Sequence, residues 1–183
     1  MGKNELDILR DVSERLGSAG IAFMLTGSVA MNYYAQPRMT RDIDLVIALT
    51  AADAEVFVRM FEADYYLDQD TIALAIARRS MFNMIHLESV IKVDCIVRKS
   101  DPFRLEEFAR RKQIHLVDFD TWIVSREDLL LSKLAWAKDS GSEMQLKDAL
   151  NLFVPECDLA YMRSRAGLLS VNVLLEDLVK RHG

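Results

Sequence analysis

A chain of 183 residues fits one compact domain and is long enough to bury a substantial core. Apolar residues make up 51% of it and charged residues 28%, and no stretch approaches the roughly 18 consecutive apolar residues of a membrane span. The net charge of −5 argues against a surface that coats nucleic acid, because such surfaces are basic. A local basic groove stays open: Arg38 and Arg41 are candidates, whereas a solvated helix end is the favoured interpretation of Arg110-Arg111-Lys112.

The N-terminal segment and the two cysteines bear on where the protein is located. The N-terminal segment lacks the charged-then-apolar order of a signal peptide, so we expect a cytoplasmic protein. Cys95 and Cys157 are too far apart in the chain to form a disulfide framework or a zinc motif. We expect both to be small core residues in a reducing compartment.

The first half of the chain alternates between helix and strand patterns. Apolar residues at helical spacing predict a helix over residues 4–17, and a short apolar run between glycines predicts a buried strand over residues 21–25. A short helix over residues 28–35 ends before Pro37. A second strand follows over residues 42–49, and Thr50 then begins another helix.

The second half adds two or three strands and then only helices. A helix is expected over residues 70–79, an antiparallel pair of strands over 82–87 and 90–97, a helix over 102–112 and a strand over 114–119. From Ser125 onward every pattern is helical. The sequence therefore predicts an α/β (α+β) core over residues 1–122, with a mixed sheet flanked by helices, and a C-terminal helical region over residues 123–183 that packs on it.

Gly27 and Ser28 lie where a strand hands over to a helix. Unpaired backbone N–H groups and the helix dipole favour a bound phosphate at such a place, and glycine allows the phosphate to approach closely. The signal is weak by itself, because Gly-Ser before a helix is more often only a turn and a cap.

Asp42 and Asp44 form the strongest chemical signal. Side chains alternate along a strand, so these carboxylates point to the same side while Ile43 points into the core. Two adjacent carboxylates repel each other unless a cation lies between them, which favours a Mg²⁺ site. The alternative is a solvated pair, or one that is neutralised by Arg38 and Arg41.

Asp94 strengthens the metal interpretation, because it lies inside an otherwise apolar strand where an unpaired charge is costly. Three acids from two strands could share one or two Mg²⁺ ions, and Asp94 could accept a proton from an attacking hydroxyl. The alternative, which we consider weaker, is a rim position where Asp94 pairs with Lys92 or Arg98.

These motifs together resemble the DNA polymerase β-type nucleotidyltransferase superfamily. The resemblance rests on Gly27-Ser28, on Pro37 to Val46 and on Lys92 to Val97. The Arg-x-Thr-x-Asp-Ile-Asp form, together with helical segments near residues 125–134, 145–150 and 158–161, is similar to small bacterial nucleotidyltransferases related to the AbiEii-like abortive-infection toxins. The superfamily resemblance implies the nucleotidyltransferase fold, with a mixed, mainly antiparallel sheet.

The resemblance also implies roles for individual residues. Gly27 and Ser28, with Arg38 and Thr40, would bind the nucleotide, and Asp42, Asp44 and Asp94 would be the catalytic and metal-binding acids. Lys133 would correspond to a helical lysine near the triphosphate and Asp148 to a nearby acid. For Lys133, the residues alone leave a solvated helix face as an open alternative.

The expected activity is Mg²⁺-dependent transfer of a nucleoside monophosphate from an NTP to an acceptor hydroxyl. The acceptor is not written in these residues: it could be RNA such as a tRNA 3′ end, a protein or a small molecule. A toxin with an antitoxin protein as its partner is a further hypothesis. The alternatives are a non-catalytic nucleotide-binding or interaction module on the same fold and a sugar-nucleotide glycosyltransferase, which the nearby Gly-Ser turn and Asp94 disfavour.

Overall fold

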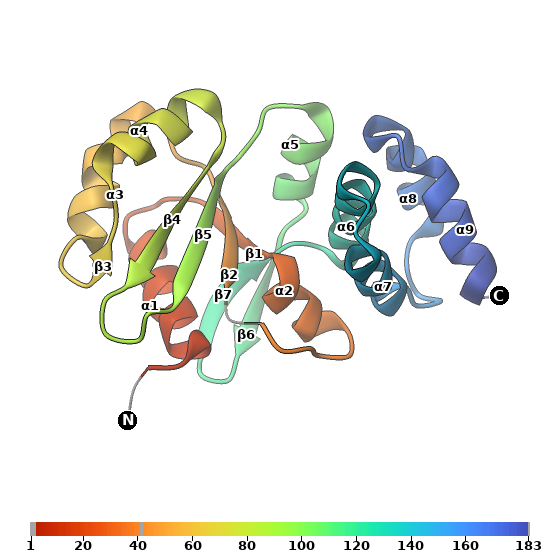
Figure 1. Cartoon of the computed structure of the whole chain (residues 1–183), viewed down its shortest axis with the longest axis horizontal. Coiled ribbons are helices and arrows are strands. Elements are labelled where there is room, and N and C mark those ends of the chain that lie inside the picture. Colours follow the sequence, from red (N-terminus) through yellow and green to blue (C-terminus); the bar gives the residue numbers. More distant parts are fainter. Residues whose placement is uncertain (1–2, 41, 183) are drawn as a thin grey trace.

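The computed structural model of the protein describes residues 3–40 and 42–182, and its elements alternate as the sequence predicts (Figure 1). In chain order they are α1 (Glu5–Ser18), β1 (Phe23–Thr26), α2 (Gly27–Tyr34), β2 (Ile43–Ile47), the 3₁₀ turn η1 (Ala51–Asp53), α3 (Ala54–Phe61), β3 (Tyr65–Tyr66), α4 (Gln69–Arg78), β4 (Met81–His86), β5 (Lys92–Val97), α5 (Pro102–Ala109), β6 (Lys112–Leu116), β7 (Phe119–Ile123), α6 (Arg126–Ser140), α7 (Glu143–Leu152), α8 (Leu159–Ala166), the 3₁₀ turn η2 (Gly167–Leu169) and α9 (Asn172–His182).

One mixed sheet of seven strands forms the centre, in the order β3-β4-β5-β2-β1-β7-β6. Strand β2 lies between β1, with which it is antiparallel, and β5, with which it is parallel. The β1–β7 pair is also parallel, and the remaining pairs are antiparallel. The predicted fold class, a mixed and mainly antiparallel sheet flanked by helices, is confirmed.

The two middle strands are buried because helices cover both faces of the sheet. All four residues of β1 are buried, and so are all residues of β2 except Asp44, which is half-buried. A carboxylate inside so apolar a strand loses hydration. Asp44 is therefore the polar interruption in the middle of the core sheet.

Three predictions about strands need correction. The single strand predicted over residues 114–119 is wrong, because the chain turns at Val117, with φ of +54°, and makes the hairpin β6–β7. Asp118 is the only common turn residue there, and no Gly, Pro or Asn accompanies it, so the local turn signal is weak. Strand β3 was not predicted, and Asp42 precedes β2 instead of starting it.

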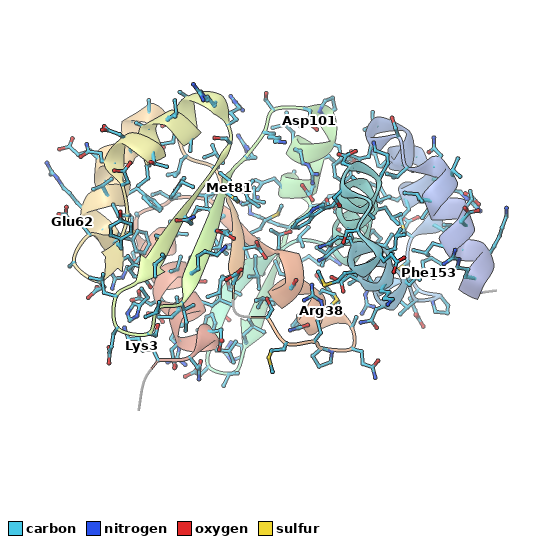
Figure 2. All side chains as sticks on the ribbon, viewed as in Figure 1. Lys3, Arg38, Glu62, Met81, Asp101 and Phe153 are labelled. Atoms are coloured by element: carbon cyan, nitrogen blue, oxygen red, sulfur yellow. The ribbon has the colours of Figure 1, made fainter. Side chains whose placement is uncertain are left out.

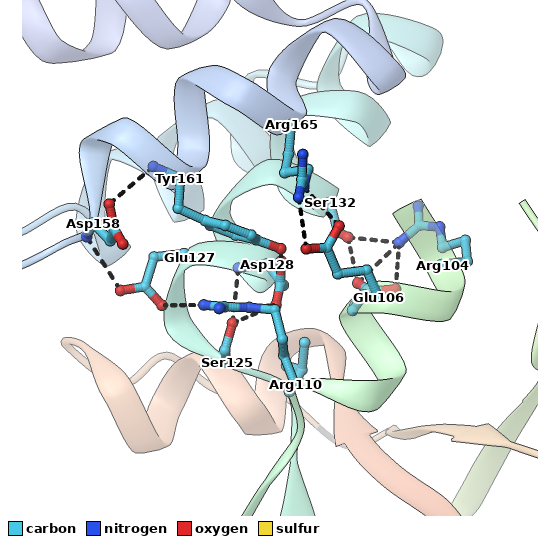
Figure 3. A network of polar contacts seen from close by, with 12 residues as sticks. Arg104, Glu106, Arg110, Ser125, Glu127, Asp128, Ser132, Asp158, Tyr161 and Arg165 are labelled. Atoms are coloured by element: carbon cyan, nitrogen blue, oxygen red, sulfur yellow. Dashed lines mark hydrogen bonds and ion pairs between the residues drawn. The ribbon is translucent and has the colours of Figure 1, made fainter. Parts of the chain in front are cut away.

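The C-terminal helices gather at one end of the molecule, away from α3 and α4 (Figure 1). A polar network joins these helices to α5 and the residue that follows it, Arg110 (Figure 3). Its centre is the fully buried Asp128 at the start of α6, which accepts hydrogen bonds from Ser125 Oγ at 2.6 Å, Arg110 Nε at 3.1 Å and Tyr161 Oη at 2.6 Å. Arg110 is thus a structural partner of α6, and the solvated helix end favoured above is wrong for it.

Strand β7 ends at Ile123, so it crosses the predicted boundary between residues 1–122 and 123–183. The division of the chain into two parts remains a prediction. Within the described ranges, no helix combines the length and apolar character that a membrane crossing needs. Cys95 and Cys157 are both buried free thiols, as predicted.

The Asp128 network gives a test of how the C-terminal helices are held. We expect Asp128→Ala to lower the free energy of unfolding by about 2–4 kcal/mol, because it leaves the buried Ser125 hydroxyl and the partly buried Tyr161 hydroxyl without their acceptor and removes the shorter of the two ion pairs of Arg110. Urea denaturation measures the loss. The matched control is Asp120→Ala, whose exposed pair with His115 should contribute less than about 0.5 kcal/mol. Equal losses in the two variants would contradict a structural role for the network.

Candidate active site

Four polar residues form a row across the sheet. The register pairs Thr26 with Asp44, Asp44 with Asp94, and Asp94 with Asn83. Residues directly opposite each other on paired strands present their side chains on the same face. The predicted meeting of Asp44 with Asp94 therefore follows from the parallel pairing of β2 with β5.

Gly27 touches Asp44 and begins α2. Its φ is +64°, and a Cβ at this position would lie 2.0 Å from Asp44 Oδ2. Both observations exclude any residue with a side chain here, because L residues rarely adopt this conformation and the carboxylate occupies the space. The backbone N–H of Ser28 donates a hydrogen bond to Asp44. The turn predicted to hold phosphate thus also fixes one of the acids.

The environment of Asp44 favours its protonated form. Burial and the neighbouring charge of Asp94 raise the pKa of Asp44 to about 6, although the charge of Lys133 and the Ser28 hydrogen bond act against the rise. Loss of hydration and a like charge both disfavour a carboxylate. A cation beside Asp44 would relieve both.

Asp94 combines the two interpretations that its sequence position allowed. It is only 7% exposed, and its Oδ2 accepts a hydrogen bond from Lys92 Nζ at 2.8 Å. The same ammonium lies 3.3 Å from Asp42 Oδ2, so Lys92 bridges the two acids. The pairing with Lys92 that we considered the weaker alternative is present, yet Asp94 is no rim residue. Its Oδ1 is buried without a hydrogen-bond partner.

These acids suit a divalent metal by their chemistry. Carboxylate oxygens are the ligands that Mg²⁺ prefers, and the unpartnered Asp94 Oδ1 and the raised pKa of Asp44 mark negative charge that is not fully compensated. In residues 3–40 and 42–182, however, no group of three His, Cys, Asp or Glu side chains is already arranged around one metal position. Lys92 neutralises part of the negative charge of Asp42 and Asp94.

A second cluster lies on the other side of the Gly27-Ser28 turn, and its centre is Asp148. The Arg38 guanidinium donates to both Asp148 oxygens, at 3.1 and 3.0 Å, and to Ser28 Oγ at 2.6 Å. Figure 2 shows Arg38 on the loop after α2, close to the C-terminal helices. Lys133 Nζ donates to Asp148 Oδ2 at 2.9 Å. Two cations are therefore held beside the turn by one acid.

Lys133 is 2% exposed, so the alternative of a solvated helix face is wrong. Burial alone would raise the pKa of Asp148, but hydrogen bonds from Arg38 and Lys133 lower it below its usual value. The cluster carries a net charge of about +1 with all three groups ionised. Such a charge beside backbone N–H groups is suited to a phosphate.

Thr40 is not part of either cluster. Thr40 Oγ1 donates only a long hydrogen bond, 3.5 Å, to the backbone oxygen of Asp42. Arg41 lies outside the described residues, so its predicted place in a basic groove is a prediction still. A role of Thr40 in nucleotide binding also stays a prediction.

A pocket of about 310 Å³ opens beside Asp44, and most of its lining was not predicted as functional. Its lining comes from the sheet face, α5 and α6: Thr26, Gly27, Asp44, Val46, Ile96, Arg98, Lys99, Arg104, Glu107, Leu129, Ser132, Lys133, Ala135, Trp136 and Asp139. Only the alternation of Asp44 with Val46 along one strand could have suggested the pocket floor. The contributions of α5 and α6 depend on tertiary packing.

Comparison with known proteins bears on the fold. No known family profile matches the sequence, and no curated protein matches it. Solved structures do match. An antigenic nucleotidyltransferase-like protein from Paracoccidioides brasiliensis superposes with a TM-score of 0.60 at 18% identity, over 98% of this chain and 94% of that one. The lincosamide antibiotic adenylyltransferase LnuA, lincomycin-bound, superposes with a TM-score of 0.53 at 14% identity, over 83% of this chain and 98% of that one.

The antibiotic-resistance factor ANT(2″)-Ia gives a TM-score of 0.54 at 11% identity, over 97% of this chain and 92% of that one. The chain has the nucleotidyltransferase fold. The superfamily resemblance is supported at that level, since identities this low establish the fold alone. The narrower similarity to AbiEii-like toxins finds no counterpart among these structures and remains a prediction.

The contact between Gly27 and Asp44 in this nucleotidyltransferase fold can be tested with a matched glycine. Gly27 and Gly141 both have positive φ, +64° and +68°, but a Cβ at Gly141 would meet nothing within 4 Å. We expect both Gly→Ala variants to lose about 1 kcal/mol from backbone strain. Gly27→Ala should in addition displace Asp44 and abolish Mn²⁺ and nucleotide binding, measured by calorimetry. Retained binding in Gly27→Ala would show that the contact is not required.

The pKa of Asp44 predicts how stability depends on pH in the metal-free protein. The folded-state pKa of about 6 exceeds the usual value of 3.8, so the folded state holds a proton that the unfolded state loses. Stability contributed by this group should be present below pH 4 and fall as the pH rises to 6. We expect Asp44→Asn to raise the free energy of unfolding by on the order of 1–2 kcal/mol relative to wild type at pH 7 in EDTA, and to leave it unchanged at pH 4. Melting temperatures of wild type and Asp44→Asn are measured from pH 4 to 8. A difference between the two proteins that does not change with pH would contradict this prediction.

Proposed function

We propose that this protein transfers a nucleoside monophosphate from an NTP to an acceptor hydroxyl, with a divalent metal ion such as Mg²⁺. The observation that carries the proposal is the adjacency of two differently charged groups across one glycine turn. On one side, Asp44 and Asp94 lie opposite each other on β2 and β5. On the other, Arg38 and Lys133 share Asp148.

The cationic side would bind the triphosphate. Backbone N–H groups at the start of α2, the Ser28 hydroxyl and the ammonium of Lys133 can all donate to phosphate oxygens. Asp148 orients Arg38 and Lys133 before the nucleotide arrives, which lowers the entropy lost on binding. The same cations would stabilise the negative charge of the departing pyrophosphate.

The acidic side would hold the metal and the attacking group. The bond that forms joins the acceptor oxygen to the α-phosphorus, and the bond that breaks joins that phosphorus to the pyrophosphate oxygen. Asp94 is the proposed proton acceptor for the hydroxyl, because Oδ1 has no other partner among the described residues. Mg²⁺ at Asp42, Asp44 and Asp94 would neutralise phosphate charge and stabilise the in-line displacement, whether one or two ions bind.

The acceptor stays open between RNA, a protein and a small molecule. LnuA is named as an antibiotic adenylyltransferase, which keeps a small-molecule acceptor among the candidates. A toxin function with an antitoxin partner is a further hypothesis, and an adjacent antitoxin gene would support it. The pocket beside Asp44 and Lys133 has room for part of one substrate.

A non-catalytic nucleotide-binding module is the main alternative. The unpartnered Asp94 Oδ1 favours catalysis, since a module that only binds phosphate has no need for a buried, incompletely paired acid. The glycosyltransferase alternative is weakened by the direct contact of Asp44 with the Gly27-Ser28 turn.

Transfer of label gives a direct test. The protein is incubated with Mg²⁺, each α-³²P-labelled NTP and either total RNA or cell extract, and covalently bound label is measured after separation. We expect label transfer by wild type, with a loss of at least about a hundredfold in the Asp42→Ala/Asp44→Ala double variant.

The matched control is Asp70→Ala, which removes an exposed carboxylate from the first turn of α4. It should transfer label at the wild-type rate. Nucleotide binding without transfer would favour the non-catalytic module, and equal transfer by the double variant would overturn the proposed site.

A further inference from the structure

The pocket beside Asp44 has two ends of different character. Gly27, Asp44 and Lys133 lie at one end, and Arg98 and Lys99 contribute to its lining just beyond β5. Val46 and Ile96 form an apolar floor between them. A ligand in this pocket therefore reaches Asp44 while contacting a second set of charged groups.

Strand geometry sets the distance between these ends. Asp94, Ile96 and Arg98 are spaced by two residues, so they follow one face of β5 and its extension. A rise of about 3.3 Å per residue puts the Arg98 backbone roughly 13 Å from that of Asp94. A group bound at Arg98 is thus well separated from the reacting centre.

Most charged side chains that line the pocket have partners. Three pairs compensate each other: Arg104 with Glu107, Asp139 with Lys138, and Lys133 with Asp148. Arg98 and Lys99 form no ion pair with any carboxylate in the part of the chain that the structure describes. The far end of the pocket is therefore positively charged in excess.

A second arginine adds to that excess. The guanidinium carbons of Arg98 and Arg111 lie 5.1 and 4.4 Å from the centre of the Phe108 ring. The Nε atoms of both arginines are buried without a hydrogen-bond partner. Burial and, to a lesser extent, the charge of Arg98 lower the pKa of Arg111, whose guanidinium also donates to the Phe108 carbonyl oxygen at 2.7 Å and lies over Trp122.

Two partly buried guanidiniums that contact one aromatic ring and have no carboxylate partner are costly unless an anion binds beside them. Their planar forks match the oxygens of a phosphate group better than a lysine does. The like charges therefore favour a ligand that carries a phosphate.

We propose that Arg98 and Lys99 form a phosphate subsite at the far end of this pocket, with Arg111 adding positive charge from beside Phe108, and that the acceptor of the transfer reaction is a phosphate ester whose hydroxyl faces Asp44, the strand partner of Asp94. The role of this ligand as an acceptor rests on the proposed nucleotidyl transfer, whereas the phosphate subsite does not. The same excess charge disfavours a polycationic acceptor. The phosphate belongs either to a free sugar phosphate or to the backbone of an oligonucleotide.

Binding in the absence of metal tests the subsite without requiring turnover. Ribose 5-phosphate is titrated by calorimetry, and an RNA pentamer with a free 3′ hydroxyl and a 5′ fluorescein by anisotropy, both in EDTA at low salt. We expect at least one probe to bind wild type and to bind Arg98→Gln and Lys99→Gln roughly tenfold more weakly, the loss of one charge-assisted contact. The probe that responds identifies the source of the phosphate.

The control is Arg181→Gln, which removes an exposed charge from α9 and should leave binding unchanged. Melting temperatures of the Arg98 and Lys99 variants should stay close to that of wild type, because neither side chain forms an ion pair in the described residues and Lys99 is exposed; this keeps loss of binding separate from loss of folding. Wild-type affinity in both variants, or no binding of either probe to wild type, overturns the proposal.

NTP binding separates this proposal from the function on which it rests. Lys133→Met should weaken NTP binding, and Arg98→Gln should not. If Arg98→Gln weakens NTP binding and leaves both phosphate probes unaffected, these cations serve the nucleotide and the acceptor proposal is overturned. If Lys133→Met leaves NTP binding intact, the triphosphate assignment fails while the phosphate subsite stands on its own titrations.

Discussion

The close packing of the Asp44 carboxylate on the backbone of Gly27 is the constraint from which the rest of the site follows. It needs the antiparallel register that pairs Thr26 with Asp44, and it needs a residue without a side chain at the first position of α2. The same turn presents the Ser28 N–H to the acid and the Ser28 hydroxyl to Arg38. Strand register, helix start and the separation of anionic from cationic groups are thus set by one contact.

Charges around that contact are interleaved so that the protein can fold before any ligand binds. Lys92 bridges Asp42 and Asp94, and Asp148 holds both Arg38 and Lys133. Each arrangement places one ion between two of the opposite sign, which limits repulsion inside a partly buried site. The compensation is incomplete on the acidic side, where Asp44 keeps a raised pKa. An incoming cation would meet acids that are already close together.

The parts of this architecture that could be predicted from the sequence are those with local signals. Alternation along a strand predicted that Asp44 and Ile43 point to opposite faces, and the apolar run around Asp94 indicated a buried acid. The β6–β7 turn at Val117 had no Gly or Pro to mark it. Burial of Lys133 depends on α7 bringing Asp148 beside it, a tertiary contact that no spacing along α6 encodes. The lining of the pocket by α5 and α6 was hidden for the same reason.

Unsatisfied polar atoms in this fold differ in what surrounds them. Arg10 and Arg165 also have an Nε without a hydrogen bond, yet each guanidinium forms an ion pair, with Asp118 and Glu106. Arg98 and Arg111 have no such acid in the described ranges, and Asp94 Oδ1 has no donor. A protein close to its stability limit keeps such costs mainly where activity needs them. Two of these costs fall on Asp94 and Arg98, whose backbones lie roughly 13 Å apart along β5 and its extension; a ligand with an anionic end and a reactive hydroxyl would satisfy that arrangement.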